Sequence, residues 1–212
     1  MELDKKSIEL AINKAQHCQR NWDLSKQIPK EDLDLMVHAV TQCPSKQNVA
    51  FYKVFVITDR EVIEGIHANT TGFTLMNDAF DEMKGDEKVV TNSQTLANVL
   101  FVFTSNVDNS DGVRIKREYH NENDHTFERD LQQSVGVAAG MVSLTSTLLG
   151  YKTGYCACFD NEEIKNILVT DDDVVLMMGI GYKSDINRRK HHKDHSVIFP
   201  SIKKEKIPVT YI

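Results

Sequence analysis

The stretch that decides the fold is DLQQSVGVAAGMVSLTSTLLGYKTG, residues 130–154. Most of it lies in the longest helix that the apolar pattern predicts, from about Thr126 to Leu149, and Gly150 is placed to end that helix as a C-cap glycine. The centre of the helix, residues 135–140, is rich in small side chains, and each internal glycine costs about 1 kcal/mol relative to alanine. Close packing of another backbone explains such glycines, either across a dimer or within one subunit.

The elements on either side of this helix follow from hydrophobic periodicity and capping signals. Helices are expected around residues 8–15, 33–40 (starting after Pro29), 58–69 (with Thr58 and Glu61 as a capping box), 75–85 and from 160 onward (with Asp160 and Glu163 as a second box). Strands are expected at residues 51–58, 99–104, 151–159 and 174–182, with a short edge strand at 207–212. This order, without repeats or a linker, predicts an α+β or mixed α/β single domain covering residues 1–212.

Composition excludes several classes of protein. The chain has 212 residues, of which 41% are hydrophobic and 26% charged, as in ordinary globular domains. The longest apolar run, residues 174–180, is far shorter than the roughly 20 residues of a membrane span. The N-terminal MELDKKSIEL does not resemble a secretory signal, and the four cysteines form no C-x-x-C pair. We therefore expect a cytoplasmic protein with no membrane partner.

Charge is unevenly distributed along the chain. The net charge of −6 argues against a nucleic-acid partner. Residues 183–206, however, hold eight basic and three acidic residues, while the remainder is strongly acidic. Such a segment suggests one bound anion, although a solvated C-terminal tail would show the same composition.

Most single motifs point to no chemistry. The Gly179–Ser184 run follows a strand but lacks the third glycine and the helix of a dinucleotide fingerprint. Two histidine groups, His191/His192/His195 and His120/His125, lack zincin spacing and are expected to be solvated rather than metal ligands.

The alternating Cys156 and Cys158 would share one face of a strand, and small buried side chains explain them better than a redox pair does.

Polar segments adjoin most of the predicted strands. They are QHCQRNWD at 16–23, PSKQN at 44–48, NSQTLA at 92–97, YCACFD at 155–160 and RRK at 188–190. Neither composition nor spacing alone indicates that they converge. In this order, together with the 130–154 stretch and GIGY at 179–182, they resemble the nitroreductase family of flavoprotein oxidoreductases over nearly the whole chain.

The resemblance implies a role for each segment. Residues 16–23 resemble the loop that holds the phosphate and ribityl chain of FMN, and residues 44–48 resemble the family's Pro-Ser-Ser-x-Asn turn. Residues 92–97 lie where members often carry a flavin-contacting Asn or Gln. Residues 155–160 take the place of the loop that faces flavin N5, and residues 188–190 resemble the terminal phosphate-binding basic pair.

The fold implied by the resemblance is α+β, with a mostly antiparallel mixed central sheet flanked by helices. It includes a long central dimer helix and a C-terminal strand that reaches the partner. The implied activity is that of a homodimer with two FMN sites at its interface. A hydride passes from NAD(P)H through flavin N5 to an electron-poor acceptor such as a nitroaromatic or quinone, in two half-reactions.

The implied site residues all bind cofactor, because the flavin supplies the reactive chemistry and no catalytic acid, base or metal ligand is expected. Arginine and lysine are suited to the phosphate, and small polar side chains to the ribityl chain and ring edges. The candidate FMN-binding residues are Gln16, His17, Cys18, Arg20, Pro44, Ser45, Lys46, Asn48, Asn92, Gln94, Tyr155, Cys156, Ala157, Cys158, Arg188, Arg189 and Lys190.

Several positions depart from the family pattern. Gln16 stands where arginine is usual and Cys18 where serine is, residues 50–51 are Ala-Phe rather than Gln-Pro, and residues 157–158 are Ala-Cys rather than Glu-Gly. Lys46 is placed to stabilise negative charge on reduced flavin, or else is simply solvated.

Other readings compete with the oxidoreductase. They are a specialised flavoenzyme of the same fold (a dehalogenase, a flavin-fragmenting enzyme or an oxidase), a flavin-binding protein without turnover, and a structural dimer without cofactor.

Overall fold

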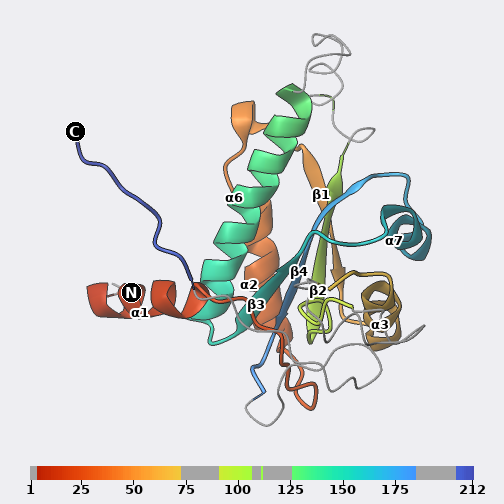
Figure 1. The fold of residues 1–212 in the computed structure, drawn as a ribbon, viewed down its shortest axis with the longest axis horizontal. Helices are drawn as coiled ribbons and strands as arrows, with labels where there is room; N and C mark the ends of the chain where they lie inside the picture. The colour runs from red at the N-terminus through yellow and green to blue at the C-terminus, as the bar shows by residue number, and fades with distance from the viewer. Residues whose placement is uncertain (1–3, 73–90, 107–110, 112–125, 185–203) are drawn as a thin grey trace, which may run out of the picture.

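The computed structural model describes residues 4–72, 91–106, 111, 126–184 and 204–212. Within these ranges four strands form one antiparallel sheet (Figure 1). The strands are β1 (Tyr52–Ile57), β2 (Val99–Ser105), β3 (Lys152–Cys156) and β4 (Val174–Gly181), in the spatial order β1-β2-β4-β3. Each lies where the sequence predicts a strand, although β3 ends three residues before the expected end at Phe159.

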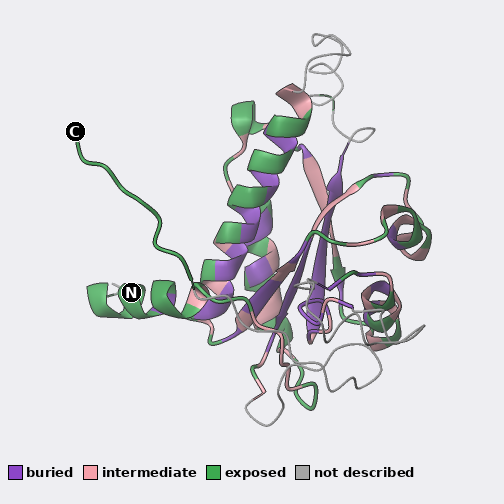
Figure 2. Cartoon of the chain, in the orientation of Figure 1, coloured by how far each residue is buried: buried purple, intermediate pink, exposed green. Residues whose placement is uncertain are grey.

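Helices cover the two faces of this sheet (Figures 1 and 2). The helices α2 (Lys30–Thr41) and α6 (Thr126–Leu148) pack on one face, and α3 (Arg60–Ala68) and α7 (Asn161–Leu168) on the other.

The central strand β2 is buried on both faces, as its apolar run predicts. Phe101 and Phe103 enter the core beneath α2 and α6, while Leu100 and Val102 enter the core beneath α3 and α7. Full burial of each such side chain contributes about 1.5–3 kcal/mol, which fixes the sheet between its two helical layers.

Helix termini follow the capping signals with one correction. Asp160 caps α7 by accepting a hydrogen bond from Glu163 N at 3.2 Å, as expected. For α3 the expected cap, Thr58, is wrong. Asp59 accepts from Val62 N at 3.1 Å, because a carboxylate one residue further on offers the same reach with a better acceptor. Gly150 follows α6 with φ of 97°, the left-handed conformation expected of a C-cap glycine.

One face of α6 is exposed along its whole length. Gly136, Val137, Gly140, Leu144 and Leu148 all lie on it. A Cβ built at Gly136 or Gly140 meets nothing within 4 Å in the described part of the chain. Packing within one subunit therefore does not explain these glycines, and we call this surface the small-residue face of α6.

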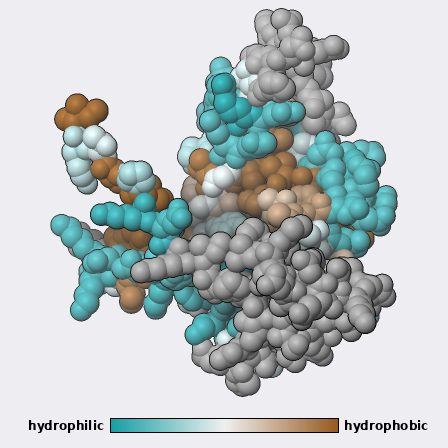
Figure 3. All heavy atoms as spheres, in the orientation of Figure 1, coloured by the Kyte–Doolittle hydropathy of each residue, from teal (hydrophilic) through white to brown (hydrophobic). Residues whose placement is uncertain are grey.

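The C-terminal residues differ from their prediction. Residues 204–212 form no strand in the chain, and the expected edge strand at 207–212 is absent from its sheet. Ile207, Val209 and Tyr211 are 71%, 70% and 94% exposed, and the C-terminal segment extends away from the body (Figures 1 and 3). A strand needs a neighbour, and these residues have none among the residues that the structure describes.

Several sequence predictions fall outside the described residues. They are the helix around 75–85, most of the polar 105–125 excursion, both histidine groups, and Arg188, Arg189 and Lys190. Among the helices that the structure describes, none is sufficiently long and apolar to cross a membrane. The described residues also contain no cluster of three or more His, Cys, Asp or Glu side chains that could hold a metal ion.

Candidate functional site

Two glycines face each other across β3 and β4 and let loops lie directly on the sheet. Gly154 and Gly179 are partners in the β3–β4 register. A Cβ at Gly154 would lie 2.5 Å from the Gln19 carbonyl oxygen, and one at Gly179 would lie 2.1 Å from the Gln94 carbonyl oxygen. Since real side chains do not approach backbone so closely, glycine at both positions is what admits the loops carrying Gln19 and Gln94.

Backbone hydrogen bonds hold residues 16–23 against the ends of β3 and β4. Gln19 N donates to Thr153 O at 2.7 Å, and Ser184 N donates to Asn21 O at 3.0 Å. The indole Nε1 of Trp22 donates to Ser93 O at 2.9 Å, which joins this loop to the next one. The predicted loop at 16–23 is thus confirmed, and it lies next to residues 92–94.

His67 of α3 organises the loop at 91–95. Its Nδ1 lies 3.1 Å from both Asn92 O and Thr95 Oγ1, and its Nε2 lies 2.9 Å from Thr91 Oγ1. A carbonyl oxygen only accepts, so Nδ1 carries the proton and Nε2 accepts from the Thr91 hydroxyl. The sequence analysis missed His67, because no local pattern connects a helix histidine with a loop 24 to 28 residues away.

The same loop presents the two amides expected at the flavin. Asn92 shapes the turn, because its Oδ1 accepts from Gln94 N at 3.0 Å. Gln94 is buried against the glycine pair, with its Cβ and Cγ closest to Gly154. Ser93 Oγ is buried without a hydrogen-bond partner among the described residues. An orphaned hydroxyl beside two amides fits a polar ligand that completes the loop.

Beyond β3, residues 157 and 158 turn outward. Ala157 and Cys158 are exposed, and Cys158 O accepts from Thr71 N at 2.8 Å. Cys156 is buried and its Sγ lies 3.4 Å from Cys158 O. Burial raises the pKa of the Cys156 thiol to about 11. The expectation that both cysteines share a buried face is therefore wrong for Cys158, because the strand ends at Cys156.

Three of the predicted segments thus lie along β3: residues 16–23 and 91–95 pack against its glycine pair, and residues 155–158 follow its C-terminal end. We call residues 16–23, 91–95 and 155–158 the loop end. Gln16, His17 and Cys18 are exposed there, while Arg20 and Tyr155 are half-buried. The convergence that spacing alone could not indicate is achieved through the sheet.

The remaining described segment, residues 44–48, lies elsewhere. It contains the short helix η1 (Lys46–Asn48), in which Gln47 and Asn48 have φ of 57° and 58°. Lys46 Nζ lies 2.8 Å from the carboxylate of Asp130, near the start of α6. We call this region the turn end (Figure 1). The 23 residues of α6 span about 33 Å, and the loop end begins after its opposite terminus. One chain therefore does not bring Ser45, Lys46 and Asn48 to the other candidates.

The Lys46–Asp130 pair is more than a solvated surface contact. The Asp130 side chain is only 1% exposed, whereas that of Lys46 is 47% exposed. A buried carboxylate needs a compensating cation, and Lys46 lies nearer to Asp130 than Arg129 does, at 2.8 Å against 3.9 Å. The reading of Lys46 as simply solvated is wrong, and Asp130 is a residue that the sequence analysis did not single out.

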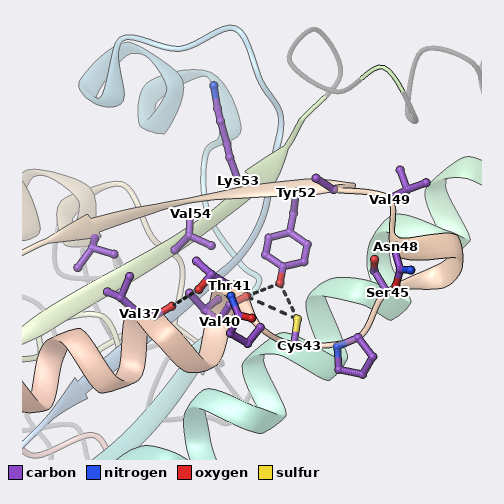
Figure 4. Close-up of a pocket in the computed structure, with 14 residues that line it drawn as sticks. Val37, Val40, Thr41, Cys43, Ser45, Asn48, Val49, Tyr52, Lys53 and Val54 are labelled. Carbon is purple, nitrogen blue, oxygen red and sulfur yellow. Dashed lines mark hydrogen bonds between the residues drawn. The ribbon is translucent and has the colours of Figure 1, made fainter.

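A cavity of about 680 Å³ adjoins the turn end, between α2 and the outer edge of β1 (Figure 4). Its lining includes Ser45 and Asn48. Within it Tyr52 OH donates to Val40 O at 2.7 Å and lies 2.7 Å from Cys43 Sγ. Burial, together with the neighbouring thiol, raises the pKa of Tyr52. The phenol is thus a neutral, fixed part of the wall.

Comparisons with known proteins bear on the family and the fold of this chain. A family model described as "Nitroreductase family" matches residues 14–182. A curated relative named "Putative NAD(P)H nitroreductase MhqN", from Bacillus subtilis (strain 168), is 27% identical over 177 residues, covering 76% of this chain and 82% of its own.

Solved structures share the fold at low sequence identity. A nitroreductase in complex with FMN from Exiguobacterium sibiricum superposes with a TM-score of 0.64 at 15% identity, covering 94% of this chain and 95% of its own. An NAD(P)H:FMN oxidoreductase from Staphylococcus epidermidis gives a TM-score of 0.63 at 17% identity, covering 94% of each chain. The α+β fold expected from the sequence is confirmed.

Proposed function

The chain belongs to the nitroreductase family, and from that premise we propose that it is an FMN-dependent oxidoreductase. It passes a hydride from NAD(P)H to an electron-poor acceptor, a nitroaromatic or a quinone. The observation that carries this proposal is the loop end, where residues 16–23 and 91–95 lie directly against Gly154 and Gly179 of the sheet. We treat residues 1–212 as one FMN-binding domain.

The donors at the loop end suit the parts of FMN. Arg20 offers a guanidinium to the phosphate, and the amides of Asn92 and Gln94 suit the edge of the ring. The exposed backbone at Ala157 and Cys158 offers an N–H to flavin N5. When bound, the flavin supplies the hydride-transfer chemistry, so the role of the protein is to bind the flavin and hold it in one orientation. Side-chain identity at Ala157 then matters less than backbone position.

The turn end reaches a flavin only in a dimer. The small-residue face of α6 is apolar and unpartnered, and Gly136 and Gly140 allow a second helix to approach closely. Pairing this face with the same face of a second copy about a two-fold axis perpendicular to α6 runs the two α6 helices antiparallel. The turn end of one copy then lies near the loop end of the other, and two equivalent sites result.

The C-terminal segment fits the same dimer. In the described sheet β1 and β3 are the edge strands. The outer edge of β3 is occupied, since Thr153 O accepts from Gln19 N, whereas β1 borders the cavity at the turn end. Ile207, Val209 and Tyr211 alternate as in a strand and are exposed. We infer that this segment adds to the edge of β1 in the partner.

Lys46 has a defined part in that site. Asp130 fixes the ammonium through bonds of 2.8 and 3.0 Å, and nearly half of the Lys46 side chain remains exposed. A held cation near the ring of the partner's flavin would favour negative charge on reduced flavin.

The four cysteines are unpaired, which fits a reducing, cytoplasmic setting.

A visible absorption spectrum of the purified full chain, taken after FMN is added and free cofactor removed, tests the proposal. A retained oxidised-flavin band that bleaches with NADH or NADPH, and returns when a quinone is added, supports it. A retained band that NAD(P)H leaves unchanged would favour a flavin-binding protein without turnover. A colourless protein would overturn the flavin proposal altogether.

A further inference from the structure

Three lysines gather where α1 (Lys5–Ala15) ends and β3 begins. Lys152 is the first residue of β3, and its Nζ donates to Lys14 O in the last turn of α1 at 3.0 Å. Lys152 of β3 pairs with Gly181 of β4, and Lys183 lies two residues after Gly181. The cluster therefore joins the first helix and both strands of the loop end.

The positive charges of these three lysines repel one another. Partial burial lowers the pKa of Lys152, and the nearby charges of Lys14 and Lys183 lower it further. In the described part of the chain Lys152 has no carboxylate within 4 Å, whereas Lys30, Lys46, Lys53 and Lys165 each have one. A half-buried ammonium beside like charges is unfavourable unless an anion completes the group.

The cluster borders the loop that is expected to hold phosphate. Residues 19–21 are hydrogen-bonded at one end to Thr153, which follows Lys152, and at the other end to Ser184, which follows Lys183. Arg20 therefore lies between these two hydrogen bonds. Gln16, which stands where arginine is usual, is neutral and its Nε2 turns back to donate to Asn13 O at 2.9 Å. Gln16 therefore does not supply the absent cation, and the three lysines lie within the same part of the fold.

We propose that Lys152, assisted by Lys14 and Lys183, forms a phosphate-binding subsite that takes the terminal phosphate of FMN in place of the arginine absent at Gln16. This inference rests on the proposed function and adds three binding residues to it. A phosphate monoester is close to a dianion at neutral pH and accepts several hydrogen bonds, which suits clustered ammonium groups acting as point charges. The Lys14 carbonyl accepts one hydrogen bond from the Lys152 ammonium, which fixes its position and leaves its other N–H donors for a ligand.

Riboflavin lacks the phosphate of FMN, so a comparison of the two isolates the subsite. Dissociation constants for FMN and riboflavin are measured by flavin fluorescence on the full chain freed of cofactor. For Lys152→Gln we expect FMN affinity to fall by roughly tenfold, as the loss of one charge-assisted hydrogen bond does, with riboflavin affinity unchanged. Lys152→Arg keeps the charge and should retain most of the preference. Lys14→Gln and Lys183→Gln should each give a smaller loss.

Lys6, exposed in the first turn of the same helix, provides the matched control. Lys6→Gln removes one positive charge from α1 and should leave both affinities unchanged. The salt dependence of FMN binding should become shallower in Lys152→Gln and stay unchanged in Lys6→Gln, because screening acts on the charge contact.

Contrary outcomes are distinguishable. Equal weakening of FMN and riboflavin by Lys152→Gln would mean a structural role, and unchanged FMN affinity would remove Lys152 from the site; either result overturns the inference and leaves the proposed function intact. A loss confined to the KM for NADPH relative to NADH would assign the cluster to the 2′-phosphate of the nicotinamide cofactor and also overturn it. If the unsubstituted chain binds neither flavin, the proposed function itself fails.

Discussion

At the loop end, residues 16–23 are hydrogen-bonded both to β3 and to residues 91–95, while at the turn end a single segment is tied to α6 by a buried ion pair. The described segments of the loop end come together within one chain. The turn end carries polar candidates, Ser45 and Asn48, and in the described part of the chain no other candidate segment lies beside them. If both ends serve one flavin site, as proposed, folding of one copy assembles only part of that site and a second copy has to supply the rest.

The largest expected effect comes from adding a side chain to a glycine against which the loop end packs. In Gly179→Ala the new Cβ would lie 2.1 Å from Gln94 O and 2.9 Å from Ala97 Cβ, in the middle of a sheet. We expect a loss of about 3 kcal/mol or more in the free energy of unfolding, together with loss of FMN binding, because a buried backbone has to move. Urea unfolding and a flavin titration measure both.

Gly65→Ala is the matched control for that change. Its Cβ would meet Ile167 Cδ1 at an ordinary 3.9 Å, inside helix α3. Stability should rise by up to about 1 kcal/mol from helix propensity. If Gly179→Ala were as harmless as Gly65→Ala, the loops would not lie on the sheet as described.

A second change separates the two ends by disrupting the dimer. Gly140→Leu places a large side chain on the small-residue face of α6, where the single chain has open space. The chain should stay folded but become monomeric, at a cost to association of about 2–4 kcal/mol, as for a central interface position. Sedimentation equilibrium measures the oligomeric state and circular dichroism the fold. A dimer that withstands Gly140→Leu would show that α6 is not the interface.

A smaller effect is expected from the anchor of the 91–95 loop. His67→Ala removes the bridge among Asn92 O, Thr95 Oγ1 and Thr91 Oγ1, which should weaken FMN binding by about 1–2 kcal/mol. His67→Asn keeps an amide donor near the Nδ1 position and should recover part of the affinity. Equal losses in the two variants would mean that packing, rather than donation to the loop, is the role of His67.

The smallest perturbation is chemical labelling of thiols. Because its pKa is raised to about 11, Cys156 is protonated and unreactive at pH 8, and it is also buried. Exposed Cys158 should react with iodoacetamide, and FMN should slow that reaction, as read by peptide mass spectrometry. Labelling of Cys158 at the same rate with and without FMN would remove residues 157–158 from the flavin site.

The sequence analysis predicted the elements well where the pattern is strong. The long 3.6-residue periodicity around residues 126–149 and the doubly apolar run at 99–104 gave α6 and β2 nearly to the residue. Short signals were less exact, since Thr58 and Asp59 are adjacent residues that can both cap a helix. The alternating 207–212 segment was predicted as an edge strand, but a strand pattern does not identify the neighbouring strand, and the described part of the chain offers it none.

The geometry of the candidate site was not predictable from the sequence. That Gln19 lies on Thr153 and Trp22 on Ser93 depends on strand order and register, which local spacing does not encode. The same holds for the distance of residues 44–48 from the loop end. His67, Asp130 and Lys152 were missed because their significance comes entirely from long-range contacts.

A mixed dimer tests most directly the central claim that each site joins the loop end of one copy to the turn end of the other. One copy carries Arg20→Glu at the loop end, the second carries Ser45→Ala and Asn48→Ala at the turn end, and differently tagged chains are purified together. Each variant alone should bind FMN poorly. The account predicts that the mixed dimer regains one intact site, formed by the unchanged ends of the two copies, and so binds about one FMN. No recovery in the mixed dimer, with both chains present, would mean that each site lies within a single chain and would contradict the account.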